Sequence, residues 1–301
     1  MSIRPMTEAD APCFADRYTA SAARPGAEKF ESMTAARASY LLDIDRGQRG
    51  FGLVGESSDG VSMIGGTIRQ EASGEVECFG PYVPAGADPA RSAELLAAFA
   101  ECCAERSLVP SLWLSEHDAD RLAVVARLGW RTTAELQWLR HPTPIRNPGL
   151  TRFGSNLRLG DARADLGTYL QIYNEGFANH VGDVAATMDD ISFKMADPLH
   201  QESEITIAYV DDQPAGAIEY WRDTRIDGTH VGWITNIIVR VPFRSNLEIV
   251  LSLGSNGSRA MSHAGAVAGK GLLDPQRTAL SRLYLMLGCT VHDTYAGYAP
   301  S

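Results

Sequence analysis

The sequence lacks the long apolar run that a membrane-spanning helix needs. No stretch approaches the roughly 20 consecutive apolar residues that cross a bilayer. The first ten residues, MSIRPMTEAD, contain acidic side chains where a secretion signal would have its apolar segment. We therefore expect a cytoplasmic protein with no membrane partner.

The sequence is also poor in cysteine and in positive charge. Its five cysteines include no CxxC pair of the kind that holds zinc or exchanges disulfides, so we expect reduced structural thiols and no metal. His117, with Asp118 and Asp120 close by, is interpreted as part of a capped helix start and not as a metal cluster. A formal net charge of −10 argues against nucleic acid as a partner and favours a small molecule or a protein.

Signs of disorder are absent as well. Charged residues make up 21% of the chain and apolar residues 45%, with 28 glycines and 15 prolines among 301 residues. This composition is typical of a folded globular protein. At roughly 150 residues per domain, the length predicts about two domains.

A proline-rich segment lies near the middle of the chain. The stretch HPTPIRNPGLTRFGSN, residues 141–156, has neither helical nor strand periodicity. Such a segment is typical of an interdomain linker. We therefore place a first domain at residues 1–141, a linker at 142–156 and a second domain at 157–301.

Similar patterns recur on both sides of this linker. FGLVGE and VSMIGGTIRQ flank the turn SSDG in the first half, and ITIAYV and AGAIEYWR flank DDQP in the second, so each half contains a predicted hairpin. Gly66 and Gly216 are 150 positions apart, and the leucine-glycine pairs that end at Gly129 and Gly288 are 159 apart. The conserved order predicts two copies of one fold, the alternative being one large irregular domain.

Each half is predicted to form an α/β unit with a mixed sheet. The expected order is strand, two helices, a meander of three strands, helix, strand, helix and strand. Thr7 and Asp10 have the spacing of a capping box at the first helix, and Asp161 is the predicted N-cap in the second half.

These landmarks resemble the Gcn5-related N-acyltransferase (GNAT) family, and in particular its tandem members of the mycothiol-synthase type. IRPMTEADAPCFADRY is similar to the family's first strand and helix, and VVARLGW and LYLMLGC are similar to its LYxxLGF motif. The resemblance covers nearly the whole chain, once per half. It implies two tandem GNAT folds and transfer of an acyl group from acyl-CoA to an amine.

The family binds the CoA pyrophosphate at a glycine-rich helix start, and the first half departs from that motif. Ala90 and Ser92 stand at the glycine positions, Arg91 could meet a phosphate, and Asp88 would repel one unless it caps the helix. A cofactor site and a simple surface turn are equally compatible with this segment. The predicted cofactor contacts of the first half are Tyr82, Val83, Ala90, Arg91 and Ser92.

The second half departs further from the motif. Arg244 matches the family's basic residue, but Leu247 and Ile249 replace the glycines and Glu248 adds negative charge. Taken alone, this loop is better interpreted as a surface turn that enters a helix. The resemblance still implies cofactor contacts in this half at Ile237, Ile238, Val239, Arg244, Ser245 and Asn246.

Candidate catalytic groups also lie in the second half. Tyr284 matches the tyrosine of LYxxLGF, which the family uses as the general acid for the CoA thiolate, whereas the first half has Val125 at that position. Tyr284 could instead be a tyrosine that only packs beside its helix.

A second catalytic group has to take the proton of the acceptor amine. Glu219 is a candidate base because it lies among the apolar residues of the predicted strand AGAIEYW, where an ionised carboxylate needs a reason to be. Strand alternation places it on one face with Ala217 and Trp221, the alternative being that it faces solvent at a sheet edge. His180 is a further candidate base or acceptor ligand, the alternative being an exposed residue at a helix end.

The sequence thus predicts an N-acyltransferase that moves an acyl group, in the first instance acetyl from acetyl-CoA, directly to a small-molecule amine, with the chemistry in the second half. We expect a monomer or homodimer. Two alternatives remain at this stage: a catalytically degenerate GNAT-fold binding or regulatory protein, and a GNAT-fold transferase that uses an acyl carrier other than CoA.

Overall fold

The chain folds into two compact units. A computed structural model describes residues 1–22, 33–44, 46–84, 86–141, 157–178, 184–198, 203–224, 228–276, 278–286 and 288–301. The first unit comprises Met1–Leu136 together with Asp293–Ser301, and the second comprises Gln137–His292. The predicted linker, 142–156, and His180 lie outside the described residues.

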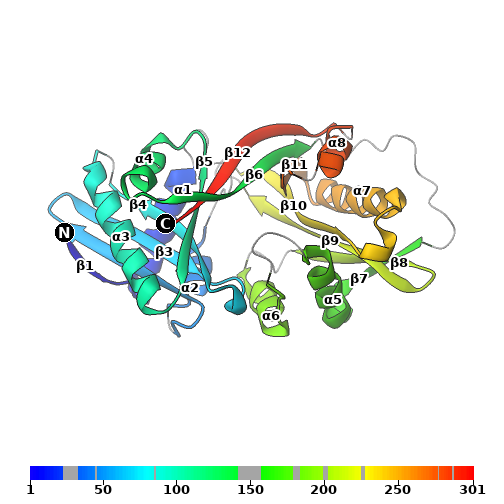
Figure 1. Ribbon diagram of the computed structural model, residues 1–301, viewed down its shortest axis with the longest axis horizontal. Helices are drawn as coiled ribbons and strands as arrows, with labels where there is room; N and C mark the ends of the chain where they lie inside the picture. The colour runs from blue at the N-terminus through cyan, green and yellow to red at the C-terminus, as the bar shows by residue number, and fades with distance from the viewer. Residues whose placement is uncertain are drawn as a thin grey trace. The chain divides into compact units, whose positions relative to one another are not determined.

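The first unit is a mixed sheet with helices on both faces. Its elements are β1 (Ser2–Pro5), η1 (Glu8–Asp10), α1 (Ala11–Ala22), α2 (Ala35–Leu42), β2 (Gly50–Ser57), β3 (Gly60–Thr67), η2 (Glu71–Ser73), β4 (Glu75–Tyr82), α3 (Pro89–Glu105), β5 (Val109–Ser115), α4 (Ala119–Arg127) and the start of β6 (Arg131–His141). The strands follow the order β1-β2-β3-β4-β5, and β12 (Thr290–Ala299) pairs with β5. Helices α1 and α2 cover one face, over a cluster that includes Phe14 and Met63, while α3 and α4 cover the other, over Leu96 and Phe99 (Figure 1).

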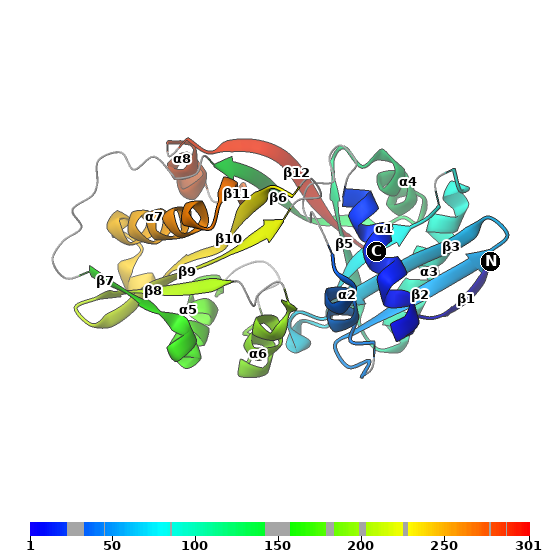
Figure 2. The ribbon, with the colours of Figure 1, turned by 180° about the vertical axis from the view of Figure 1, so that it is seen from behind.

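The second unit repeats this arrangement. Its elements are β7 (Leu157–Asp161), η3 (Ala162–Ala164), α5 (Leu166–Phe177), α6 (Met188–Ala196), β8 (Glu204–Val210), β9 (Gln213–Thr224), β10 (His230–Val239), η5 (Val241–Phe243), α7 (Leu247–His263), β11 (Ala266–Leu273) and α8 (Thr278–Met286). The strands follow the order β7-β8-β9-β10-β11, and β6 pairs with β11. Helices α5 and α6 lie on one face, in a cluster that includes Ile172 and Ile207, and α7 lies on the other, in a cluster that includes Ile218 and Ile249 (Figure 2).

The order of elements matches the prediction in both halves, but the end of the last strand of each half belongs to the other unit. Residues 137–141 of β6 pair with β11, and Tyr295–Tyr298 of β12 pair with β5. The division therefore differs from the expected boundaries at 141 and 157. Strand alternation marks a segment as a strand without stating which sheet edge receives it, so this exchange has no local signal.

The ends of α4 and α8, which carry the segments similar to LYxxLGF, have the same local structure. Gly129 and Gly288 both adopt positive φ, 68° and 85°. The N–H of Trp130 donates to the Val125 carbonyl, and that of Cys289 to the Tyr284 carbonyl, each at 3.0 Å. This helix-ending motif, which favours glycine, places Tyr284 at the position that Val125 holds in the first unit.

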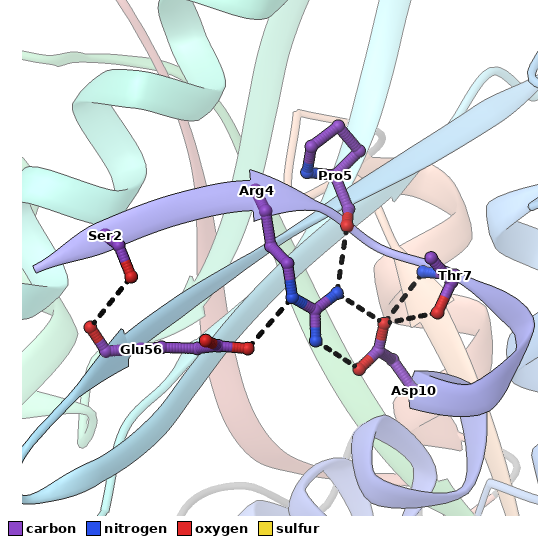
Figure 3. Close-up of polar contacts among 6 residues, drawn as sticks. All are labelled: Ser2, Arg4, Pro5, Thr7, Asp10 and Glu56. Atoms are coloured by element: carbon purple, nitrogen blue, oxygen red, sulfur yellow. Dashed lines mark hydrogen bonds and ion pairs between the residues drawn. The ribbon is translucent and has the colours of Figure 1, made fainter.

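The predicted capping box is confirmed at the start of the first unit (Figure 3). The Asp10 carboxylate accepts hydrogen bonds from the Thr7 N–H at 2.8 Å and from the Arg4 guanidinium at 2.8 and 2.9 Å. The bonds from Arg4 and Thr7 hold the pKa of Asp10 well below its usual range. Arg4 also donates to Glu56 on β2 at 2.9 Å, so one guanidinium ties β1, β2 and the helix start together. In the second unit, the predicted cap Asp161 accepts from the Arg163 N–H at 2.9 Å.

The five cysteines are free thiols, as expected. Burial raises the pKa of Cys103 to about 12 and that of Cys289 to about 11, which keeps both thiols protonated and unreactive. Among the described residues, no helix combines the length and apolar character that crossing a bilayer requires.

Candidate functional site

In each unit, two neighbouring parallel strands separate partway along their length. In the second unit, β10 and β11 pair from His230 to Ile234, whereas β10 continues in register with β9 as far as Val239. In the first unit, β4 and β5 pair only from Glu75 to Glu77, and β4 runs on to Tyr82. A point where adjacent parallel strands part exposes backbone groups between them, and ligands commonly bind at such positions in α/β sheets.

Beside this separation in the second unit, Glu219 is held by three side chains. It lies on β9 with 0% of its surface exposed. One carboxylate oxygen, Oε2, accepts from the Tyr169 hydroxyl at 3.1 Å and from Asn236 Nδ2 at 3.2 Å, and it also contacts the Lys194 ammonium. These partners come from α5, β10 and α6. Because a buried carboxylate is stable only when it is paired and hydrogen-bonded, the arrangement accounts for a charge in the core.

The alternative position of Glu219, facing solvent at a sheet edge, is wrong. Alternation along β9 points Ile218 and Tyr220 toward α7, so Ala217 and Glu219 face α5 and α6. The strand lies between β8 and β10 and is covered on both faces. A single sequence gives the alternation but not the position of a strand within its sheet.

A bulge in β10 brings Asn236 to the same face. The register between β10 and β9 shifts between Ile234 and Asn236, which leaves Thr235 as the extra residue. Ile234 packs on the α7 side, whereas Ile238 packs with α5. Gly176 permits this contact, because a Cβ there would lie 1.9 Å from Ile238 Cγ2.

The neighbouring aromatic residues complete the surroundings of Glu219. Burial, together with the charge of Glu219, raises the pKa of Tyr169 well above its usual value, so this phenol remains a hydrogen-bond donor. The ring of Tyr173 lies 6.0 Å from that of Tyr169 and 5.9 Å from Lys194 Nζ.

Tyr284 lies on the other side of the same sheet. It is half-buried on α8 and packs against the cluster between the sheet and α7, which includes Ile249 and Leu253. The structure therefore places Tyr284 and Glu219 in one unit, on opposite faces of the sheet whose strands separate. Packing beside its helix and a role in chemistry are both compatible with this position of Tyr284.

Several hydrogen-bond donors of the loop after β10 are already bonded to side chains of the protein. Arg240 Nε donates to Glu175 Oε2 at 2.6 Å, and the Val241 N–H donates to Glu175 Oε1 at 3.0 Å. The Asn246 side chain accepts from the Glu248 N–H at 3.0 Å and so caps α7. The Glu175 carboxylate and the Asn246 side chain therefore already accept hydrogen bonds from N–H groups of the kind that donate to phosphate oxygens in other proteins.

The remaining predicted contacts of this loop differ in exposure. Arg244 and Ser245 are exposed, whereas Ile238 is buried and Ile237 and Val239 are half-buried. Leu247, at a glycine position of the motif, is 52% exposed. The basic group is accessible here, but a leucine side chain stands where close backbone approach would be needed.

The equivalent loop of the first unit is also closed by its own side chains. Asp88 accepts from the Ala90 N–H at 2.8 Å, which confirms it as the N-cap of α3, and Pro89 is the first helical residue. Arg91 donates to Asp59 at 2.7 Å. Ser92 is buried against the core, so it faces away from the solvent side of the helix start.

The other predicted contacts of the first unit are at the end of β4. Tyr82 is buried on the α1 and α2 side, with its ring 5.5 Å from that of Phe14 and 5.9 Å from that of Tyr18. Burial raises its pKa above the usual range. Val83 follows the strand and is half-buried.

A group of possible metal ligands lies in the first unit. Donor atoms of Glu116, His117 and Asp293 all lie within 4.8 Å of one another. Asp118 instead caps α4 by accepting from the Arg121 N–H at 3.3 Å, as expected for a capped helix start. The sequence could not place Asp293 beside His117, because the contact depends on the exchanged strand β12.

A groove of about 550 Å³ in the second unit has no counterpart in the sequence prediction. Of its lining residues, Asn256 of α7 donates to the Thr206 hydroxyl at 3.2 Å, and Glu204 accepts from the Tyr220 hydroxyl at 2.6 Å. It is lined by Leu159, Gly160, Asp161, Arg163, Ser203, Glu204, Ile205, Thr206 and Asn256.

The sequence matches no protein-family profile and no curated protein sequence. Solved structures, in contrast, resemble it over almost its whole length. A tandem GNAT protein of the clavulanic acid biosynthesis pathway superposes with a TM-score of 0.74 at 12% identity, covering 99% of this chain and 97% of that one. A GCN5-related N-acetyltransferase from Sphaerobacter thermophilus gives 0.70 at 16% identity, covering 99% and 94%.

A third neighbour, a GCN5-related N-acetyltransferase from Anabaena variabilis, gives 0.59 at 11% identity and covers 99% of this chain and 72% of that one. At these identities the likeness establishes the fold. The chain therefore has the tandem fold of the GCN5-related N-acetyltransferases.

Proposed function

We propose that the protein is an acyl-CoA-dependent N-acyltransferase whose chemistry takes place in the second unit and whose acceptor is a small-molecule amine. The observation that carries the proposal is the buried carboxylate of Glu219 beside the separation of β10 from β11. The first unit supplies a scaffold, or a structural CoA site, because its position equivalent to Tyr284 is Val125.

In this mechanism Glu219 is the general base. On the side of α5 and α6, the acceptor amine takes the place of the Lys194 ammonium on the buried carboxylate and transfers a proton to it as the amine attacks the thioester carbonyl. Asn236 and Tyr169, which donate to Oε2, hold the carboxylate in place. Lys194 balances its charge while no amine is bound.

In the same proposal, the backbone of β10 acts on the thioester carbonyl oxygen, and Tyr284, on the opposite face of the sheet, acts on the leaving thiolate. In the proposal, a backbone N–H near Ile237 to Val239, beyond the point where β10 leaves β11, polarises the carbonyl. Tyr284 approaches from the α7 side and donates its proton to the CoA thiolate. Base and acid then act from opposite faces of one sheet, which suits direct transfer between two bound substrates.

A binding and a turnover measurement test the proposal together. Native mass spectrometry with acetyl-CoA should show at least one bound nucleotide per chain, and thiol release with a panel of primary amines should exceed the rate without protein. Absence of binding and of thiol release with every amine would contradict the proposal.

The helix-start loops favour a second candidate function, a GNAT-fold binding or regulatory protein without transfer activity. Asp88 in one unit and Asn246 in the other already accept from the first amides of α3 and α7. Bound acetyl-CoA that stays intact with every amine would support this candidate over the first. A transferase that uses a different acyl carrier would instead release thiol from an acyl-pantetheine and not from acetyl-CoA.

A further inference from the structure

Lysine is rare in this chain, and the ammonium group of one lysine contacts the buried carboxylate of Glu219. The sequence contains three lysines against 24 arginines. Lys29 lies outside the described residues, and Lys270 is 4% exposed on β11. The third, Lys194, contacts Glu219. An arginine could also balance the charge of Glu219, but only a lysine can lose a proton under ordinary conditions and become a nucleophile.

The Lys194 amine occupies the place that the proposed mechanism gives to the acceptor. Its Nζ contacts Glu219 Oε2, the oxygen that Asn236 also contacts, and Asn236 is two residues beyond the last pair between β10 and β11. The side chain of Lys194 is 23% exposed, whereas that of Glu219 is completely buried. Of the two partners, the amine is therefore the one that a second molecule can reach.

We propose that Lys194 is a site of self-acylation, at which the second unit transfers the acyl group of its own acyl-CoA to Nζ. This inference rests on the proposed function and adds an acceptor to it. The site is built by α6, β9 and β10 of one unit, so the transfer needs no second protein.

The step balances with groups already described. The Lys194 ammonium gives one proton to Glu219 Oε2, and the freed lone pair attacks the thioester carbonyl carbon. The C–N bond forms, the C–S bond breaks, and the CoA thiolate receives a proton through Tyr284. The second proton lost by nitrogen leaves to solvent, which also restores Tyr284 and Glu219, and the products are an amide on Lys194 and free CoA.

Acylation would change the electrostatics around Glu219. The amide is neutral, so Glu219 would keep the hydrogen bonds from Tyr169 and Asn236 but lose its positive partner. The ring of Tyr173, 5.9 Å from Nζ, offers an apolar surface beside the new acyl group. Self-acylation would thereby remove the ionic contact between Lys194 and Glu219.

Mass spectrometry tests this inference directly. The full-length protein is incubated with acetyl-CoA that carries a ¹³C-labelled acetyl group, and its intact mass and chymotryptic peptides are followed with time. We expect one added acetyl group, located on Lys194, with release of one equivalent of thiol. Because the chain has three lysines, each can be assigned individually.

Two variants and one control separate catalysed from chemical acylation. Lys194→Arg keeps the positive charge and should abolish the label, and Glu219→Gln should slow labelling of Lys194 at least tenfold. Urea-unfolded wild type reports the uncatalysed rate. Equal labelling of Lys194 in the folded, unfolded and Glu219→Gln proteins would overturn the inference. Should Lys194→Arg fail to fold, the peptide map of the wild type still decides.

Failure of the inference and failure of the proposed function give different results. If amines are acetylated while Lys194 stays unlabelled, the inference is wrong and the proposed function stands. Labelled Lys194 without turnover of any amine would support self-acylation and contradict the small-molecule acceptor. If acetyl-CoA is neither bound nor cleaved, both are wrong.

Discussion

Corresponding faces of the sheet are filled differently in the two units. In the first unit, the face toward α1 and α2 is filled by an apolar and aromatic cluster that includes Phe14, Met63 and Tyr82. In the second, the face toward α5 and α6 contains the ion pair of Glu219 and Lys194. One fold thus supports an apolar and aromatic core in one copy and a buried ion pair in the other.

The largest expected effect comes from removing the positive partner in the second unit. Lys194→Met leaves Glu219 buried without its counter-ion, and breaking such a pair typically costs about 3–5 kcal/mol. Urea denaturation of this variant should show that loss, and the double variant Lys194→Met with Glu219→Leu should recover much of it.

A matched pair in the first unit serves as the control. Asp59 pairs with Arg91 but is 66% exposed, so Asp59→Asn should cost no more than about 1 kcal/mol. Similar losses for Lys194→Met and Asp59→Asn would contradict the view that burial makes the Glu219–Lys194 pair more important for stability than the exposed Asp59–Arg91 pair.

The tyrosines of the two units should differ in their effect on transfer. Tyr284→Phe removes the proposed general acid and should lower the rate of thiol release about 100-fold. Tyr82→Phe removes a hydroxyl from the aromatic cluster of the first unit and should change the rate less than about 2-fold. Native mass spectrometry should show that both variants still bind acetyl-CoA, and equal rates would remove Tyr284 from the mechanism.

An acid-sensitive contribution to stability is expected in the first unit. The pKa of Asp10 is depressed in the folded state, so its contribution is complete above the unfolded pKa of about 3.9 and is lost as the pH falls below it. Asp10→Asn should cost about 1–2 kcal/mol at pH 7, from the lost bonds to Arg4 and Thr7. Denaturation curves at pH 7 and pH 3 should show that the difference between wild type and variant shrinks in acid. A difference independent of pH would argue against the charged contact.

The smallest effect concerns the helix-start loops. Asp59→Asn frees Arg91 beside the start of α3 and should tighten acetyl-CoA binding to the first unit about 2- to 5-fold in low salt, with less gain at high salt. Titration calorimetry at two salt concentrations measures this. No change at low salt would indicate that the first unit does not bind the nucleotide at this loop.

The sequence predicted those features whose signals are local. The hairpins, the order of elements, the capping box of Thr7 and Asp10 and the glycines at 129 and 288 follow from turn chemistry, periodicity and helix-end preferences, and the structure confirms them. The equivalence of Tyr284 and Val125 followed from the same motif.

Features that depend on distant partners could not be predicted. The exchange of β6 and β12, and the approach of Asp293 to His117, depend on which sheet edge receives a strand. Likewise, the sequence left open a position of Glu219 facing solvent at a sheet edge, because nothing in one sequence states that Lys194, 25 positions earlier, packs against it.

The most direct test of the account is the rate of thiol release in a single turnover, measured for wild type and Glu219→Gln with saturating acetyl-CoA and a primary amine that the wild type accepts. Glutamine keeps the size of the side chain but cannot take the acceptor's proton. The account predicts a loss of at least about 100-fold in the Glu219→Gln variant with unchanged acetyl-CoA affinity. A rate within about 2-fold of wild type would contradict the assignment of the chemistry to the second unit's buried carboxylate.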